Sequence, residues 1–193
     1  MSIESAHGMK DTLMKLPLVK PIFTLALCWL SAAAHAHVVL AEPVALANTS
    51  YRAAFRVGHG CDGRPTTGIR VSLPAGFQGA KPMPKAGWTL NVRSEKLAKP
   101  YLSHGKTITD DVVEITWTAT SPEHALSDAW YDEYVLRGQL AVQNGPLWFK
   151  VLQTCDQGAI DWADVPEAGT STQGMKTPAA LLEVIPSSAV HHH

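Results

Sequence analysis

The sequence is poor in cysteine and lacks the motifs that mark common enzyme classes. Its 193 residues contain three cysteines, none of them in a C-x-x-C pair, so a cysteine-based metal motif is absent. Neither a G-x-S-x-G elbow nor an H-E-x-x-H helix occurs. The adjacent carboxylates Asp110/Asp111 and Asp132/Glu133 would point to opposite faces of a strand, which argues against a shared acid–base pair. We therefore expect that the protein is not an enzyme.

An excess of one charge and long apolar runs are also missing. The chain has 16 basic and 17 acidic residues, a net charge of −1, with no basic run and no basic–aromatic stripe. The electrostatic footprint of a nucleic-acid or anionic-membrane binder is therefore absent from the sequence. The apolar segment at residues 22–34 has 13 residues, whereas a membrane span needs about 20. We expect neither a membrane anchor nor a nucleic-acid partner.

The first 36 residues have instead the three parts of a secretory signal peptide. Lysines 10, 15 and 20 form a basic n-region, residues 22–34 an apolar h-region, and Ala34 and Ala36 a small-x-small cleavage site. Cleavage after Ala36 would remove residues 1–36 and leave His37 first in an extracytoplasmic, for example periplasmic, protein. A cut after Ala34 also satisfies the small-x-small rule and would leave His35 first.

A histidine at a free N-terminus is a chelating group. The α-amine and one imidazole nitrogen of His37 can hold one metal ion in a five- or six-membered ring, and nitrogen-rich sites favour Cu(II) among the divalent first-row metals. If cleavage falls after Ala34, the chain begins His35-Ala36-His37, a tripeptide pattern that also binds Cu(II) or Ni(II). Either cut leaves a histidine first, so a metal site is predicted while its ligand set stays open.

The cysteines of the exported chain predict a disulfide. Cys28 lies in the signal peptide, which leaves Cys61 and Cys155 in an oxidising compartment. Their bridge would close a loop of 93 residues, for which chain entropy gives at most about 4 to 5 kcal/mol. The alternative is a thiolate pair for Cu(I). We favour the disulfide.

Period-two alternation of apolar and polar residues recurs along the mature chain and indicates half-buried strands. In residues 51–57, for example, Tyr51 and Phe55 share one face while Arg52 and Arg56 share the other. The pattern predicts strands at 38–40, 51–57, 69–73, 88–93, 113–118, 134–140, 147–155, 160–162 and 181–185. Residues 122–131 can form a short helical turn and residues 163–177 a long loop. About seven to nine strands without helical crossovers predict an antiparallel β-sandwich.

Three further residues can take part in a metal site. Glu42 lies five residues after His37, and its other interpretation is a solvated edge residue. His59 follows a strand within a glycine-rich loop; it can supply a second imidazole, although we prefer a loop histidine that packs beside the disulfide. The indole of Trp162 can cover a copper ion by a cation–π contact, and its other interpretation is core packing.

The sequence predicts three segments, of which one is a folded domain. We expect a signal peptide at 1–36, one copper-binding β-sandwich domain at 37–186, and a C-terminal tail at 187–193. The tail ends in His191, His192 and His193, which resemble the start of a purification tag, so we assign them no role.

Several segments together resemble the YcnI-like family of exported bacterial copper-binding proteins. They are HVVL at 37–40, HGCDGRPTT at 59–67, KPMPKAGW at 81–88, YDEY at 131–134, QTC at 153–155 and DW at 161–162. The resemblance implies an immunoglobulin-like sandwich that binds one Cu(II) per chain through a single-histidine brace. It implies that His37 supplies amine and ring nitrogen, that a glutamate assists, with Glu42 as the candidate, and that Trp162 lies close to the metal. It also favours the cut after Ala36.

The leading hypothesis is therefore an extracytoplasmic copper chaperone or buffer that exchanges copper with other periplasmic or membrane copper-handling proteins. The alternatives are an oxidative copper enzyme, which would need His59 as a second imidazole, and a metal-free adhesion or assembly module.

Overall fold

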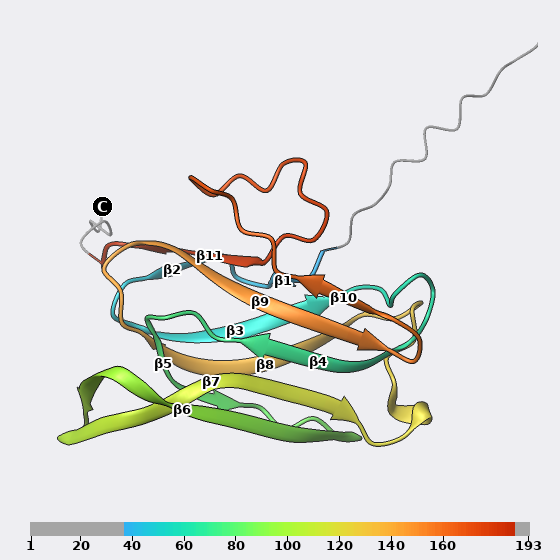
Figure 1. Cartoon of the computed structure of the whole chain (residues 1–193), viewed down its shortest axis with the longest axis horizontal. Coiled ribbons are helices and arrows are strands. Elements are labelled where there is room, and N and C mark those ends of the chain that lie inside the picture. The colour runs from blue at the N-terminus through green and yellow to red at the C-terminus, as the bar shows by residue number, and fades with distance from the viewer. Residues whose placement is uncertain (1–36, 188–193) are drawn as a thin grey trace, which may run out of the picture. The chain divides into compact units, whose positions relative to one another are not determined.

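The alternating sequence folds into two β-sheets (Figure 1). The computed structural model describes residues 37–187, so the predicted signal peptide at 1–36 and the three histidines at 191–193 lie outside the described residues. The strands, in chain order, are β1 (Val39–Leu40), β2 (Val44–Leu46), β3 (Ser50–Val57), β4 (Thr66–Ser72), β5 (Phe77–Pro82), β6 (Trp88–Ser103), β7 (Lys106–Ala119), β8 (Asp132–Leu140), β9 (Gly145–Cys155), β10 (Ala159–Trp162) and β11 (Ala180–Ile185).

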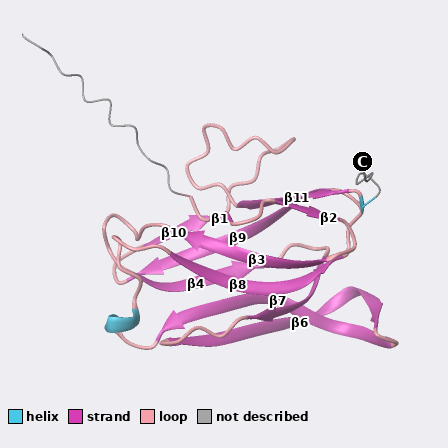
Figure 2. Ribbon diagram, turned by 180° about the vertical axis from the view of Figure 1, so that it is seen from behind, coloured by secondary structure: helices cyan, strands magenta, loops and turns pink. Residues whose placement is uncertain are grey.

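The two sheets form the predicted sandwich (Figure 2). One sheet has the strand order β1-β3-β8-β5, and the other has the order β2-β11-β9-β4-β7-β6 with β10 paired to β9. Neighbouring strands are antiparallel except β2 and β11, which run parallel. The chain changes sheet between β1 and β2, because β1 pairs with β3 while β2 pairs with β11.

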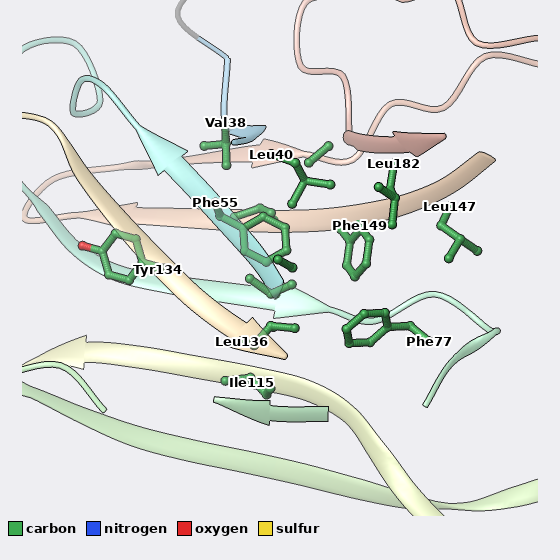
Figure 3. Close-up of a cluster of buried hydrophobic side chains, with 14 of the residues drawn as sticks. Val38, Leu40, Phe55, Phe77, Ile115, Tyr134, Leu136, Leu147, Phe149 and Leu182 are labelled. Atoms are coloured by element: carbon green, nitrogen blue, oxygen red, sulfur yellow. The ribbon is translucent and has the colours of Figure 1, made fainter. Parts of the chain in front are cut away.

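The predicted alternation is confirmed, and it places the core between the sheets. In β3, Tyr51 and Phe55 are buried while Arg52 and Arg56 are exposed. Aromatic side chains from both sheets meet in the centre (Figure 3): Phe149 packs edge-on against Phe55 at 5.5 Å and against Phe77 at 5.3 Å between ring centroids. Burial of each such side chain stabilises the fold by about 1.5 to 3 kcal/mol.

The described residues contain eleven strands, more than the seven to nine expected. β2 has three residues, too few to show a period, and β5 contains a glycine-centred irregularity that breaks its alternation. β6 and β7 extend well past the predicted strands as one long hairpin, whose outer part carries mostly exposed residues and so lacks an apolar face to detect. The turn at His104-Gly105 has positive φ at both residues, 48° and 75°, as a two-residue type I′ hairpin turn requires.

The non-strand segments agree with the sequence. The predicted helical turn is a short 3-10 helix at Pro122–His124, and His104 and His124 are both exposed. Residues 165–177 form a loop without strands. No helix among residues 37–187 has the length and apolar character needed to traverse a bilayer.

Candidate functional site

His37 is attached directly to the rigid sandwich. Val38 and Leu40 are 2% and 4% exposed and point into the core, as Figure 3 shows. Val39 pairs with Arg56 of β3, so the antiparallel register brings His37 to the end of β3, next to the loop that contains His59. The imidazole of His37 is half-buried. The backbone of His37 is therefore held next to two residues that are anchored in the core.

Trp162 forms a wall beside His37. The indole is 4% exposed, and the His37 and Trp162 ring centroids are 5.7 Å apart with planes tilted by 59°. Trp162 is the last residue of β10, which pairs with β9 so that Trp162 lies opposite Val151. Figures 1 and 2 both show the start of β1 close to the end of β10. The pair that the sequence predicted to be neighbours is brought together.

A buried glutamine fixes the orientation of Trp162. The indole Nε1 donates a hydrogen bond of 3.0 Å to Oε1 of Gln153, which is fully buried. The Gln153 Nε2 group donates to the backbone oxygen of His59 at 2.7 Å and to Oγ1 of Thr66 at 2.8 Å. Because the amide uses its acceptor and both of its donors, its burial is compensated.

Sequence reasoning did not identify Gln153 or Thr66. The signal was nevertheless present, because Gln153 interrupts the inward-facing apolar series Leu147, Phe149 and Val151 of β9. A polar side chain in a core position needs a hydrogen-bonding partner. That requirement points to a buried network in this part of the sandwich.

His59 contacts the other side of the site and the disulfide region. Its ring packs edge-on against Trp162, with centroids 6.1 Å apart and planes at 75°. Its backbone oxygen accepts the Gln153 hydrogen bond described above. The structure therefore places His59 in a loop, as preferred, and also within reach of the indole that faces His37.

The loop after His59 is a tight turn that backbone hydrogen bonds between Cys61 and Arg64 close and that the predicted disulfide ties to β9. Cys61 and Cys155 are bonded, which confirms that pairing. A Cβ atom at Gly60 would lie 1.7 Å from the carbonyl oxygen of Arg64, so this position requires glycine. The Gly60 amide donates a 2.8 Å hydrogen bond to a carboxylate oxygen of Asp128. Asp128 is thus a carboxylate that the structure brings to this turn and that sequence reasoning did not identify.

Glu42 lies at the far end of β1 from His37. The Ala41 amide bonds to Ala54 of β3, and the hydroxyl of Tyr51 donates to the backbone oxygen of Glu42. Burial raises the pKa of the Tyr51 hydroxyl well above its ordinary value, and the nearby negative charge of Glu42 adds to that rise. Glu42 is exposed, and its role as a ligand stays a prediction.

The residues present suit a chelate that uses the chain's own N-terminus. Within residues 37–187, no three His, Cys, Asp or Glu side chains gather closely enough to hold a metal ion. An α-amine at His37 would add a nitrogen on the residue whose imidazole already faces Trp162.

Comparison with known proteins gives a family and a fold. Residues 37–184 match the family model described as "Domain of unknown function (DUF1775)". A solved structure described as "Crystal structure of an uncharacterized protein from Nocardia farcinica reveals an immunoglobulin-like fold" is similar, with 22% identity and a TM-score of 0.58. The similarity covers 77% of this chain and 98% of that one. Among proteins with curated descriptions, none matches this chain. The structural likeness supports the immunoglobulin-like sandwich.

Proposed function

We propose that this chain, which belongs to the DUF1775 family, is an exported copper-binding protein that stores or delivers Cu(II) in copper homeostasis. The resemblance to YcnI-like proteins led to this hypothesis. The observation that supports it most is the position of His37, half-buried at the head of β1 and 5.7 Å from the buried indole of Trp162. The match to the family also begins at His37.

In this proposal His37 is the principal ligand. Signal cleavage after Ala36 frees its α-amine, and the amine and imidazole then hold one Cu(II) per chain. Both nitrogens must be deprotonated to bind. Because a free α-amine has a pKa of about 7.7 to 8.0, the affinity for Cu(II) should increase as the pH rises toward 8.

The surrounding residues limit how the copper can react. Trp162 covers one side with an apolar ring, and its hydrogen bond to Gln153 keeps that ring in place. Anchoring of His37 through Val38 and Leu40 means that little chain entropy is lost when the metal binds. A preorganised site with few protein ligands suits a protein that holds copper and passes it to other copper-handling proteins outside the cytoplasm.

A copper titration with a matched pair of proteins tests this function. One protein begins at His37, and the other carries a single extra glycine before His37. In both, His191, His192 and His193 are replaced by alanine to remove competing imidazoles. We expect the first protein to bind one Cu(II), with nitrogen hyperfine structure in its paramagnetic resonance spectrum. The extra glycine displaces the α-amine, so the affinity should fall at least tenfold and the spectrum should change.

Two results would overturn the proposal. If both proteins bind Cu(II) with equal affinity and identical spectra, the α-amine of His37 is not a ligand. If neither protein binds Cu(II) while both keep the thermal unfolding of the parent chain, the protein is not a copper carrier.

A further inference from the structure

Three basic side chains form a row across the outer face of the β1-β3-β8-β5 sheet. In the register of these strands, Arg52 of β3 pairs with Arg137 of β8, and Arg137 pairs in turn with Lys81 of β5. All three residues are exposed. Paired residues on adjacent strands share a face, so the three cations lie side by side. We call Arg52, Arg137 and Lys81 the basic row; Figure 1 shows its three strands as neighbours.

The basic row is poorly neutralised by the protein itself. Glu133 lies 3.7 Å from Arg52, but it also pairs with Arg56 at 3.3 Å and accepts a hydrogen bond from the Tyr131 hydroxyl. For Lys81 and Arg137, no carboxylate of residues 37–187 lies within ion-pair distance. Like charges at directly opposed positions destabilise a sheet. The arrangement therefore weakens the fold, and a bound anion would compensate for that cost.

Two adjoining hollows open onto the basic row, and Ser50, Lys81 and Arg137 line both of them. Their volumes are about 500 and 520 Å³, within the range of small-molecule sites. The first has an apolar wall that includes Met83 and Val135. These hollows give room for a ligand with both an apolar body and charged groups.

The second hollow is closed on one side by the tip of the β6–β7 hairpin, which contributes Tyr101 and His104. The hairpin is fixed there by Asp111. Its carboxylate oxygen Oδ2 accepts hydrogen bonds from the Tyr101 hydroxyl at 2.7 Å and from the Gly79 amide of β5 at 2.9 Å. The hollow is therefore formed by two elements that are tied together.

We propose that the basic row binds a small anion that carries two or more carboxylate or phosphate groups. Neighbouring strands lie about 4.8 Å apart, so the row presents its cations along about 10 Å. A ligand whose anionic groups lie about one strand spacing apart can contact Arg137 together with Arg52 or Lys81. The guanidinium groups suit both carboxylate and phosphate because their paired N–H donors match either oxyanion. This site is separate from the proposed copper site and does not depend on it.

Calorimetric titration of the metal-free protein with citrate, and in parallel with pyrophosphate, tests the site and distinguishes the two anion types. We expect saturable binding of one anion per chain, weakened at least tenfold by Arg137→Gln and by Lys81→Gln. The matched control is Arg70→Gln. Arg70 is an exposed arginine of the other sheet that also lies 3.7 Å from one glutamate, and its loss should leave binding unchanged.

Stability without ligand gives a second readout. Because Arg137→Gln removes a repulsive neighbour from the basic row, it should raise the melting temperature by about 1 to 3 °C while it weakens binding. A loss of binding caused by misfolding would lower the melting temperature instead. The proposal is overturned if neither anion binds or if Arg70→Gln weakens binding as much as Arg137→Gln. Binding of the acidic peptide hexaglutamate in place of both small anions would also overturn it, because the row would then recognise a peptide.

Discussion

Gln153 is the residue on which the geometry of the candidate site depends most. One amide group connects the indole of Trp162, the backbone of His59 and the hydroxyl of Thr66 in a fully buried position. A buried network of this kind holds a unique arrangement because each unpaired member would carry a desolvation cost. The orientation of Trp162 toward His37 follows from it.

We predict that Gln153→Ala lowers the free energy of unfolding by about 2 to 4 kcal/mol, since it leaves buried partners unpaired and opens a cavity. Urea denaturation measures the change. Gln157→Ala, in the exposed turn after β9, should change stability by less than about 0.5 kcal/mol. Equal effects of the two substitutions would show that the network does not stabilise the protein.

Trp162 should report copper binding directly. Cu(II) at His37 would quench the fluorescence of an indole whose ring centroid lies 5.7 Å from the His37 ring. We predict that Trp162→Phe removes most of the copper-dependent quenching. The control is Trp88→Phe, because Trp88 lies on β6, three strands from β9. This variant should retain the copper-dependent quenching. Quenching that persists unchanged in Trp162→Phe would place the copper elsewhere.

At the scale of elements, alternation predicted the strands well where one face is buried. Residues 51–57 and 147–155 were recognised because their inward positions are apolar, and they form β3 and β9. The outer half of the β6–β7 hairpin was missed because both of its faces are largely exposed and its stability comes from pairing and from Asp111. The basic row was missed for a different reason. Its members are isolated in the sequence and meet only through the register of three strands.

The pairing of β3 with β8 should make stability sensitive to acid. A hydrogen bond from the Tyr131 hydroxyl, together with the guanidinium of Arg56, holds the pKa of Glu133 below its ordinary value. A carboxyl with a lowered folded-state pKa stabilises the fold above its unfolded pKa of about 4.3, and that contribution is lost as the pH falls through the folded value. Stability should therefore decrease between pH 5 and pH 3.

We predict that Glu133→Gln reduces this decrease, because glutamine carries no charge to lose. Urea denaturation at pH 5 and pH 3 measures it in both proteins. Glu167→Gln, in the exposed loop before β11, should show the same acid response as the parent. An acid response that is identical in Glu133→Gln and the parent would rule out the contribution of Glu133.

At the scale of the whole molecule, the alternating strands predicted the sandwich, and the two cysteines of the exported chain predicted its cross-link. Cys61 and Cys155 are 94 positions apart, and their bond joins the His59 loop to the end of β9. The sequence placed His59 beside this bond, but it could not show that β10 and Trp162 lie there too, because that proximity depends on the pairing of β4 with β9 and of β9 with β10. The close contact of His37 with Trp162 was expected from the family resemblance rather than from spacing.

The disulfide should contribute strongly to stability. We predict that the double substitution Cys61→Ser/Cys155→Ser lowers the free energy of unfolding by about 2 to 4 kcal/mol, because the unfolded chain regains the freedom that a long closed loop had removed. Urea denaturation of the oxidised parent and of the variant measures this difference. A change below about 0.5 kcal/mol would contradict the prediction.

We propose that His37 becomes the N-terminal residue of an exported protein and holds copper there. Native mass spectrometry of the protein recovered from outside the cytoplasm tests it most directly. The predicted result is a chain that begins at His37, is lighter by two hydrogens for the Cys61–Cys155 bond, and carries one copper ion. A chain that begins at any residue other than His37, or one that begins at His37 and takes up no copper, would contradict the claim.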